Sequence, residues 1–130
     1  MRSEINELED GWETADIIVY EPDLLFSSRI EAAAAKAGVD VKFVSNLQEI
    51  AQHLRQIAPR AIFLNLDAAE GRLGGLEEFV KKGSFRTVGY YSHVNAPLAV
   101  EARGVGIGTV LSRGVFAARL DQILRDMGSG

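Results

Sequence analysis

Polar residues of types that can take part in chemistry closely follow four apolar segments of this chain. The segments are Ile17–Tyr20, Ala61–Leu64, Thr87–Tyr91 and Gly108–Leu111. The polar side chains just after them are Glu21, Asn65, Asp67, Ser92, His93 and Arg113. A guanidinium suits an anion, and polar groups that converge at one point are typical of ligand sites. These six residues therefore form a candidate cleft for a small molecule or a nucleotide.

Catalysis by these residues is not expected. The chain contains no Cys, which excludes thiol catalysis, thiolate zinc sites and iron–sulfur clusters. A serine hydrolase needs its nucleophile on a sharp turn such as G-x-S-x-G, which is absent. Ser92 and His93 are adjacent, so in an extended strand they would point apart. We expect no catalytic residue, no metal and no cofactor, and a small hydrolase is only the third alternative.

The elements that would position these groups alternate regularly along the chain. A fifth segment, Val39–Val44, is a weaker strand between the first and second helices. The expected helices are Asp23–Ala37, Leu47–Ile57, Leu76–Lys82, Pro97–Arg103 and Val115–Met127. Asp23 is expected to cap the first helix, and Ser45 or Asn46 the second, with Glu49 placed as in a capping box. His53 is expected to be exposed on a polar face of that second helix, and Tyr90 and Tyr91 to lie on opposite faces of their strand, in the core or at its edge. Apolar strands separated by helices predict a parallel sheet covered on both faces. We therefore predict an α/β, flavodoxin-like, doubly wound sheet of five strands in the order 2-1-3-4-5 with five helices, and ligands bind such sheets beyond the carboxyl ends of the strands.

The four strong apolar segments and the weaker one account for the five predicted strands, and the length of the chain agrees with a single sheet of that size. A chain of 130 residues is one domain, and no apolar run is long enough to span a membrane. We expect a cytoplasmic protein that does not bind membranes. The net charge of −4 argues against binding to nucleic acid.

The acidity belongs to the first residues of the chain. Residues 1–16 contain six acids and one base, so the remaining residues carry a net charge of +1. We divide the chain into an acidic arm (1–15), a folded domain (16–127) and a flexible tail (128–130). Leu8 and Trp12 are four residues apart, which allows a short helix that docks on the body. The mildly basic last helix is one candidate contact for the arm.

Local sequence strings carry a resemblance to a known family. IIVYEPD, AIFLNL, VGYYSHV and GVGIGTVLSRGVF occur in the order expected for a receiver domain of the response regulators, the CheY-like domain of two-component signal transduction. The resemblance covers roughly Asp16–Arg125. It implies an Asp that accepts a phosphoryl group, an acidic pair that holds Mg²⁺, and a hydroxyl and a Lys that bind the phosphoryl group.

The chain departs from that pattern at most of the functional positions. Asn65 stands at the phosphoacceptor position, Pro22 replaces one acid of the metal-binding pair, and Gly114 replaces a Pro. Asp67 is an alternative acceptor, but the string Leu64-Asn65-Leu66 fits the family pattern better. The degenerate phosphorylation-site positions are Glu21, Pro22, Asn65, Ser92 and Arg113.

The resemblance and the departures together indicate an atypical pseudo-receiver. We predict a stand-alone signalling module that acts by phosphorylation-independent contact with a protein partner; a small-molecule or nucleotide sensor is the alternative. Receivers commonly dimerise through the fourth helix, fifth strand and fifth helix, so we expect a homodimer. The side chains expected on that face are Leu98, Glu101, Ala102, Arg119 and Asp121.

Overall fold

A single parallel sheet of five strands forms the centre of the molecule. The computed structural model describes residues 15–92 and 96–128. The strands are β1 (Ile17–Tyr20), β2 (Val41–Val44), β3 (Ala61–Asn65), β4 (Arg86–Tyr91) and β5 (Thr109–Ser112). Their order is β2-β1-β3-β4-β5, which confirms the predicted flavodoxin-like topology.

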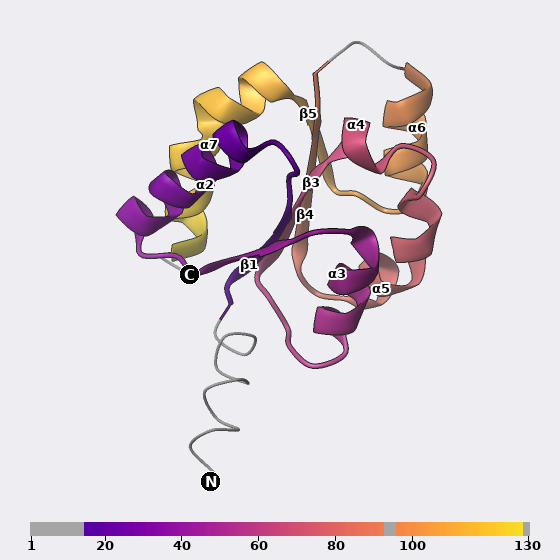
Figure 1. Ribbon diagram of the computed structural model, residues 1–130. Coiled ribbons are helices and arrows are strands. Elements are labelled where there is room, and N and C mark those ends of the chain that lie inside the picture. The colour runs from indigo at the N-terminus through magenta and orange to yellow at the C-terminus, as the bar shows by residue number, and fades with distance from the viewer. Residues whose placement is uncertain (1–14, 93–95, 129–130) are drawn as a thin grey trace, which may run out of the picture.

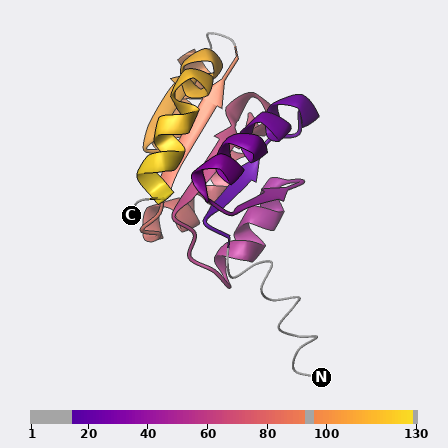
Figure 2. The same cartoon turned by 90° about the vertical axis from the view of Figure 1, so that its left-hand side faces the viewer.

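Helices cover both faces of the sheet. They are α2 (Leu24–Ala37), α3 (Leu47–Leu54), α4 (Leu66–Ala69), α5 (Glu77–Lys82), α6 (Ala96–Gly104) and α7 (Arg113–Gly128), with a 3₁₀ turn, η1, at Leu73–Leu76. Helices α2 and α7 lie on one face, and α3 to α6 lie on the other (Figures 1 and 2). No helix among the residues described is long and apolar enough to cross a membrane.

The described residues contain six α-helices, whereas the sequence predicted five. The additional one is α4, which has a single turn of four residues. A segment this short cannot display the 3.6-residue periodicity on which the prediction depended. It forms because Asn65 caps it: the Asn65 side-chain oxygen accepts a hydrogen bond from the Ala68 N–H at 3.1 Å.

The two faces of the sheet have different cores. On the α2–α7 face, the rings of Phe63, Tyr90 and Phe116 pack together. Tyr90 and Phe116 are stacked with their ring centres 4.3 Å apart, and Phe63 meets Phe116 edge-on at 5.3 Å. The opposite face is mostly aliphatic, with Ile18, Leu64 and their neighbours fully buried. Successive strand residues alternate between these cores, as the period of two requires.

Glycine at position 89 permits a close approach on the aliphatic face. A Cβ atom built at Gly89 would lie 2.8 Å from the Leu66 side chain, closer than packed carbon atoms come. Leu66 is the first residue of α4 and is fully buried. The absence of a side chain in β4 thus lets α4 sit directly against the sheet.

Two predicted caps are present. The Asp23 side chain accepts a hydrogen bond from the Leu25 N–H at 2.9 Å, which caps α2. The Asn46 side chain accepts one from the Glu49 N–H at 2.9 Å and caps α3. Glu49 returns a bond to Ser45, whose N–H donates to it at 2.5 Å. The expected capping box is therefore present, with its second bond displaced by one residue.

His53 contradicts its prediction. The sequence analysis treated it as an exposed residue on a polar face of its helix, but only 2% of it is exposed. Leu47, Ile50 and His53 are spaced by three residues, so His53 continues the buried stripe of α3. Burial lowers the pKa of His53, and the charge of Lys42 adds to this effect.

Two side chains expected at a dimer face are also buried. Leu98 is 1% exposed and Ala102 is fully buried, because both face the aliphatic core from α6. They cannot contact another molecule in this fold. The exposed apolar residue of α6 is Val100, with 67% of its surface accessible.

Candidate functional site

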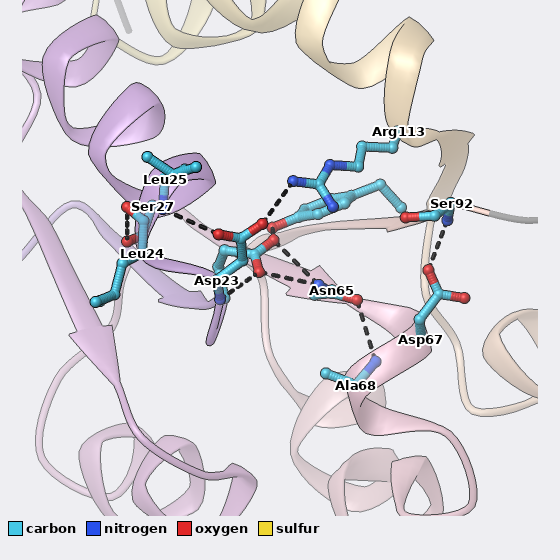
Figure 3. Close-up of polar contacts among 11 residues, drawn as sticks. Asp23, Leu24, Leu25, Ser27, Asn65, Asp67, Ala68, Ser92 and Arg113 are labelled. Carbon is cyan, nitrogen blue, oxygen red and sulfur yellow. Dashed lines mark hydrogen bonds and ion pairs between the residues drawn. The ribbon is translucent and has the colours of Figure 1, made fainter.

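The polar residues predicted to share a site come from neighbouring strand ends. In the parallel register, Tyr20 of β1 lies beside Leu64 of β3, and Asn65 lies beside Tyr90 of β4. The residues that follow β1 and β3 therefore emerge at the same edge of the sheet. Figure 3 shows this edge, with Asn65 between Asp23 and Asp67.

The Glu21 carboxylate is at the centre of a buried hydrogen-bond network. Only 5% of Glu21 is exposed. The Asn65 side-chain amide donates to both of its oxygens, at 3.0 and 3.1 Å, and the Asp23 N–H donates to one of them at 2.9 Å. The Tyr90 hydroxyl donates to the other at 2.8 Å. A buried carboxylate needs such partners, because desolvation of an unpaired charge costs several kcal/mol, on the order of 3–5 when a partner is lost.

The orientation of the Asn65 amide is set from both sides. Its oxygen accepts from the Ala68 N–H and caps α4, while its nitrogen faces Glu21. An amide has one donor group and one acceptor, and each is used here. A carboxylate at this position would have no N–H to donate to Glu21. Asn65 therefore both caps α4 and donates hydrogen bonds to the buried Glu21 carboxylate.

Tyr90 is a member of the network that the sequence analysis missed. Its alternation in β4 correctly predicted a core ring, and the ring does stack on Phe116. Its hydroxyl, however, reaches Glu21. Burial, reinforced by the Glu21 charge, strongly raises the pKa of the Tyr90 hydroxyl, which keeps it a neutral donor. The position of Tyr90 beside Asn65 in the register was the available signal.

Arg113 lies outside this network and is paired with another acid. Its guanidinium contacts the Asp23 carboxylate at 3.1 Å and lies over the Phe26 ring, 4.2 Å from the ring centre. The hydrogen bond from Arg113, together with that from Leu25, lowers the pKa of Asp23. This contact joins the start of α2 to the start of α7. The guanidinium is thus directed at Asp23 (Figure 3).

Asp67 and Ser92 form a third polar contact at this edge. The Ser92 N–H donates to the Asp67 carboxylate at 2.5 Å. This bond ties α4 to the end of β4. Asp67 lies in the first turn of α4, beyond the strand.

The five predicted cleft residues that the structure describes make separate polar contacts at this edge of the sheet. Glu21 and Asn65 are joined in the buried network, Asp67 contacts Ser92, and Arg113 contacts Asp23. His93 lies outside the described residues. A cavity of about 350 Å³ does reach Glu21, but it opens toward β2 and is lined also by Pro22, Leu24, Ser27, Phe43, Val44 and Ser45. The ligand cleft remains a prediction.

Comparisons with solved structures agree on the fold. A response regulator from Thermotoga maritima superposes with a TM-score of 0.72 at 16% sequence identity, covering 90% of this chain and 99% of that one. A response regulator from Hahella chejuensis gives 0.74 at 15% identity, covering 87% and 94%. A response regulator receiver protein from Burkholderia phymatum gives 0.68 at 12% identity, covering 87% and 94%. The chain has the receiver-domain fold. Neither a scan of protein-family models nor a search of curated proteins found a match.

Receiver domains bind Mg²⁺ through carboxylates, and the residues present here do not fit that ion. Mg²⁺ requires oxygen ligands in near-octahedral geometry. Pro22 supplies no side-chain oxygen, and both oxygens of Glu21 already accept bonds from Asn65. Within the part of the chain that the structure describes, no three His, Asp or Glu side chains gather as a metal site.

Proposed function

We propose that this protein is a receiver-like signalling module that works by contact with a protein partner, without phosphorylation. The observation that carries the proposal is the Asn65 amide on the Glu21 carboxylate. An amide is not a nucleophile that forms an acyl phosphate. Because the same amide occupies both Glu21 oxygens, it replaces the cation and the acceptor of a working receiver with one internal contact.

The test is incubation with Mg²⁺ and a small phosphodonor, followed by intact-mass measurement. We expect no gain of a phosphoryl group. Asn65→Asp alone should gain little, because Pro22 still limits metal binding. The matched variant that carries both Asn65→Asp and Pro22→Asp supplies an acceptor and the second metal ligand, so it should gain more than either single variant. A base-labile phosphoryl group on the unmodified protein would contradict the proposal.

The surface we propose for contact includes α6, β5 and α7, in a homodimer. The support is the exposed apolar side chain of Val100 on α6, together with the partial exposure of Val110 and Leu111 on β5. β5 is an edge strand of the sheet, so one side of its backbone has no neighbouring strand. Edge strands are common sites of pairing with a second chain. A cytoplasmic location is part of the same proposal.

Sedimentation equilibrium tests the dimer. We expect a mass between one and two chains that rises with protein concentration, and we expect Val100→Glu to shift it to one chain. The matched control is Leu25→Glu, because Leu25 is 85% exposed at the start of α2, outside the proposed surface and on the face of the sheet opposite α6. A dimer that is lost with Leu25→Glu and kept with Val100→Glu would place the contact at the start of α2 and contradict the proposed surface.

A further inference from the structure

An apolar groove lies at the opposite end of the sheet from the Glu21 network. It encloses about 390 Å³ between the end of α3 and α5. Its lining includes four partly exposed apolar side chains: Leu54, Ile57, Phe79 and Phe85. Such a cluster of large apolar side chains at the surface indicates a contact site.

The shape of the groove depends on one glycine. A Cβ atom built at Gly83 would lie 2.0 Å from the Phe85 ring, so the ring rests directly on the Gly83 backbone. Phe85 therefore forms one wall. Phe79 forms another, and the Arg55 guanidinium lies 5.9 Å from the centre of its ring. The groove is thus apolar within and basic at one rim.

The chain enters the fold close to this groove. The backbone oxygen of Asp16 accepts from the Arg60 N–H at 2.7 Å, and the Arg60 oxygen accepts from the Arg86 N–H at 2.9 Å. These three residues form a row across the amino ends of β1, β3 and β4, and neighbouring strands are about 4.8 Å apart. Two residues that line the groove come just before that row: Phe85 directly precedes Arg86, and Ala58 lies two residues before Arg60. Asp16 is therefore about 10 Å from the groove. Figure 1 shows α3 and α5 at the end of the sheet where β1 begins.

The segment that precedes Asp16 has a composition that matches the groove. Residues 1–14 lie outside the described residues. Their large apolar residues are Met1, Ile5, Leu8 and Trp12, at spacings of four, three and four, which would place them on one side of a helix. The same segment has five acids and one base. It is an acidic segment with one apolar stripe, and 14 residues can span up to about 46 Å when extended.

The charges around the groove complement that segment. Lys82 lines the groove, and Arg55 and Arg86 are exposed beside it. Glu78 also lines it and contacts Lys82 at 3.4 Å, so one carboxylate opposes these three cations. A segment of net charge −4 is attracted to such a rim, with a strength that falls as salt is added.

We propose that residues 1–14 bind in this groove of their own chain, as an amphipathic helix that inserts Ile5, Leu8 and Trp12 between α3 and α5. This is the helix-in-groove mode of recognition, with the peptide supplied by the chain itself. Intramolecular binding is favoured because the short connection keeps the local concentration of the segment high.

Trp12 reports directly on this contact, because it is the only Trp in the chain. In the full chain we expect its fluorescence to be blue-shifted relative to the urea-unfolded protein and protected from quenching by acrylamide. Phe79→Ala should lower the ratio of bound to free segment about tenfold, as for a central aromatic contact. The emission should then move toward the unfolded value. Lys82→Glu should act in the same direction and more weakly, and added salt should reduce its effect.

The matched control is Arg29→Glu. Arg29 is exposed on α2, on the other face of the sheet and outside the surface proposed for the homodimer, and the substitution makes the same charge change as Lys82→Glu. It should leave Trp12 emission unchanged. Circular dichroism establishes that each variant is folded; if Phe79→Ala is not, the surface variant Lys82→Glu decides. Unchanged emission in Lys82→Glu with altered emission in Arg29→Glu would overturn the proposal, because it would place the contact of the segment on the α2–α7 face. Trp12 quenching equal to that of the unfolded protein would overturn any docking.

A second copy is the competing acceptor of the segment. If binding is within one chain, Trp12 emission stays constant as the protein is diluted. A red shift on dilution, parallel to a fall in sedimentation mass, would show that the segment binds another molecule and would overturn the intramolecular proposal. The outcome is separate from the phosphorylation test, which does not involve this end of the sheet.

Discussion

The two ends of the sheet differ in the burial of their characteristic side chains: polar groups are buried at one end, and apolar groups are partly exposed at the other. At the carboxyl end, Glu21 is buried and accepts hydrogen bonds from Asn65, Tyr90 and the Asp23 backbone. At the amino end, Phe79 and Phe85 line an open groove and remain partly exposed. The end at which receivers carry out chemistry has its polar groups committed to one another. The end with no such role has surface available for binding.

This difference shows that the topology of a fold does not by itself decide which groups stand at its strand ends. The edge where ligands bind in such sheets is defined by backbone topology, so it is present here. Whether it binds anything depends on the groups placed there. A single amide at position 65 satisfies both oxygens of the carboxylate that would otherwise need a cation. In this structure the carboxylate and the amide are both buried and bonded to each other.

The largest effect should come from removing that carboxylate. Glu21→Ala leaves the Asn65 amide and the Tyr90 hydroxyl without their acceptor in a buried place. We expect the free energy of unfolding to fall by about 3–5 kcal/mol, the range for breaking a buried charged network. Urea unfolding at pH 7, followed by circular dichroism, measures it. Glu21→Gln keeps the shape and one acceptor, so its loss should be smaller.

The comparison between the ends is sharpened by Phe79→Ala as the matched truncation. It removes a larger side chain, but from a partly exposed position, so we expect a loss of only about 1–2 kcal/mol. If Phe79→Ala cost more than Glu21→Ala, the amino end would be the more tightly built one. The contrast drawn between the two ends would then be wrong.

A smaller effect is expected at Tyr90. Tyr90→Phe removes one donor and leaves Glu21 bonded to Asn65 and the Asp23 N–H, so the free energy of unfolding should fall by about 1.5 kcal/mol. Because the pKa of Tyr90 is raised in the folded protein, its contribution is fully present below the ordinary tyrosine value of about 10 and is lost as the pH rises above it. The alkaline fall in stability should therefore be less steep in Tyr90→Phe.

Absorbance titration provides the readout specific to that hydroxyl. The chain has three tyrosines. In the folded protein Tyr90 should not ionise before the chain unfolds, whereas it should titrate near pH 10 in urea. Ionisation of all three tyrosines near pH 10 without unfolding would show that the network is open to water.

The strand order could be predicted from the sequence because five apolar segments alternate with helical patterns and because crossovers in parallel sheets are right-handed. The cap at Asp23 could also be predicted, since a carboxylate directly before a helix commonly accepts hydrogen bonds from the first N–H groups of that helix. Helix α4 was missed because one turn has no period. His53 was misjudged because its polarity was given more weight than its spacing from Ile50.

The candidate site was only partly within reach of the sequence. The positions of Glu21 and Asn65 at neighbouring strand ends were correctly expected, but their hydrogen bond depends on side-chain geometry. The participation of Tyr90 required the register of β3 against β4. Arg113 was placed with the cleft because of its charge, whereas in the structure it pairs with Asp23 and covers Phe26. The contact depends on which carboxylate lies within reach of the Arg113 guanidinium, and strand order alone does not reveal this.

Gly89 gives the site a constraint that its own polar residues do not show. Any side chain at position 89 would displace Leu66, the residue that follows Asn65 in the chain. The amide would then lose its alignment with Glu21, although position 89 touches neither. Among homologues of this chain, position 89 should tolerate fewer residue types than exposed positions of the site such as Pro22. The requirements of the site would therefore restrict the residue type at a position that contributes no side chain to it.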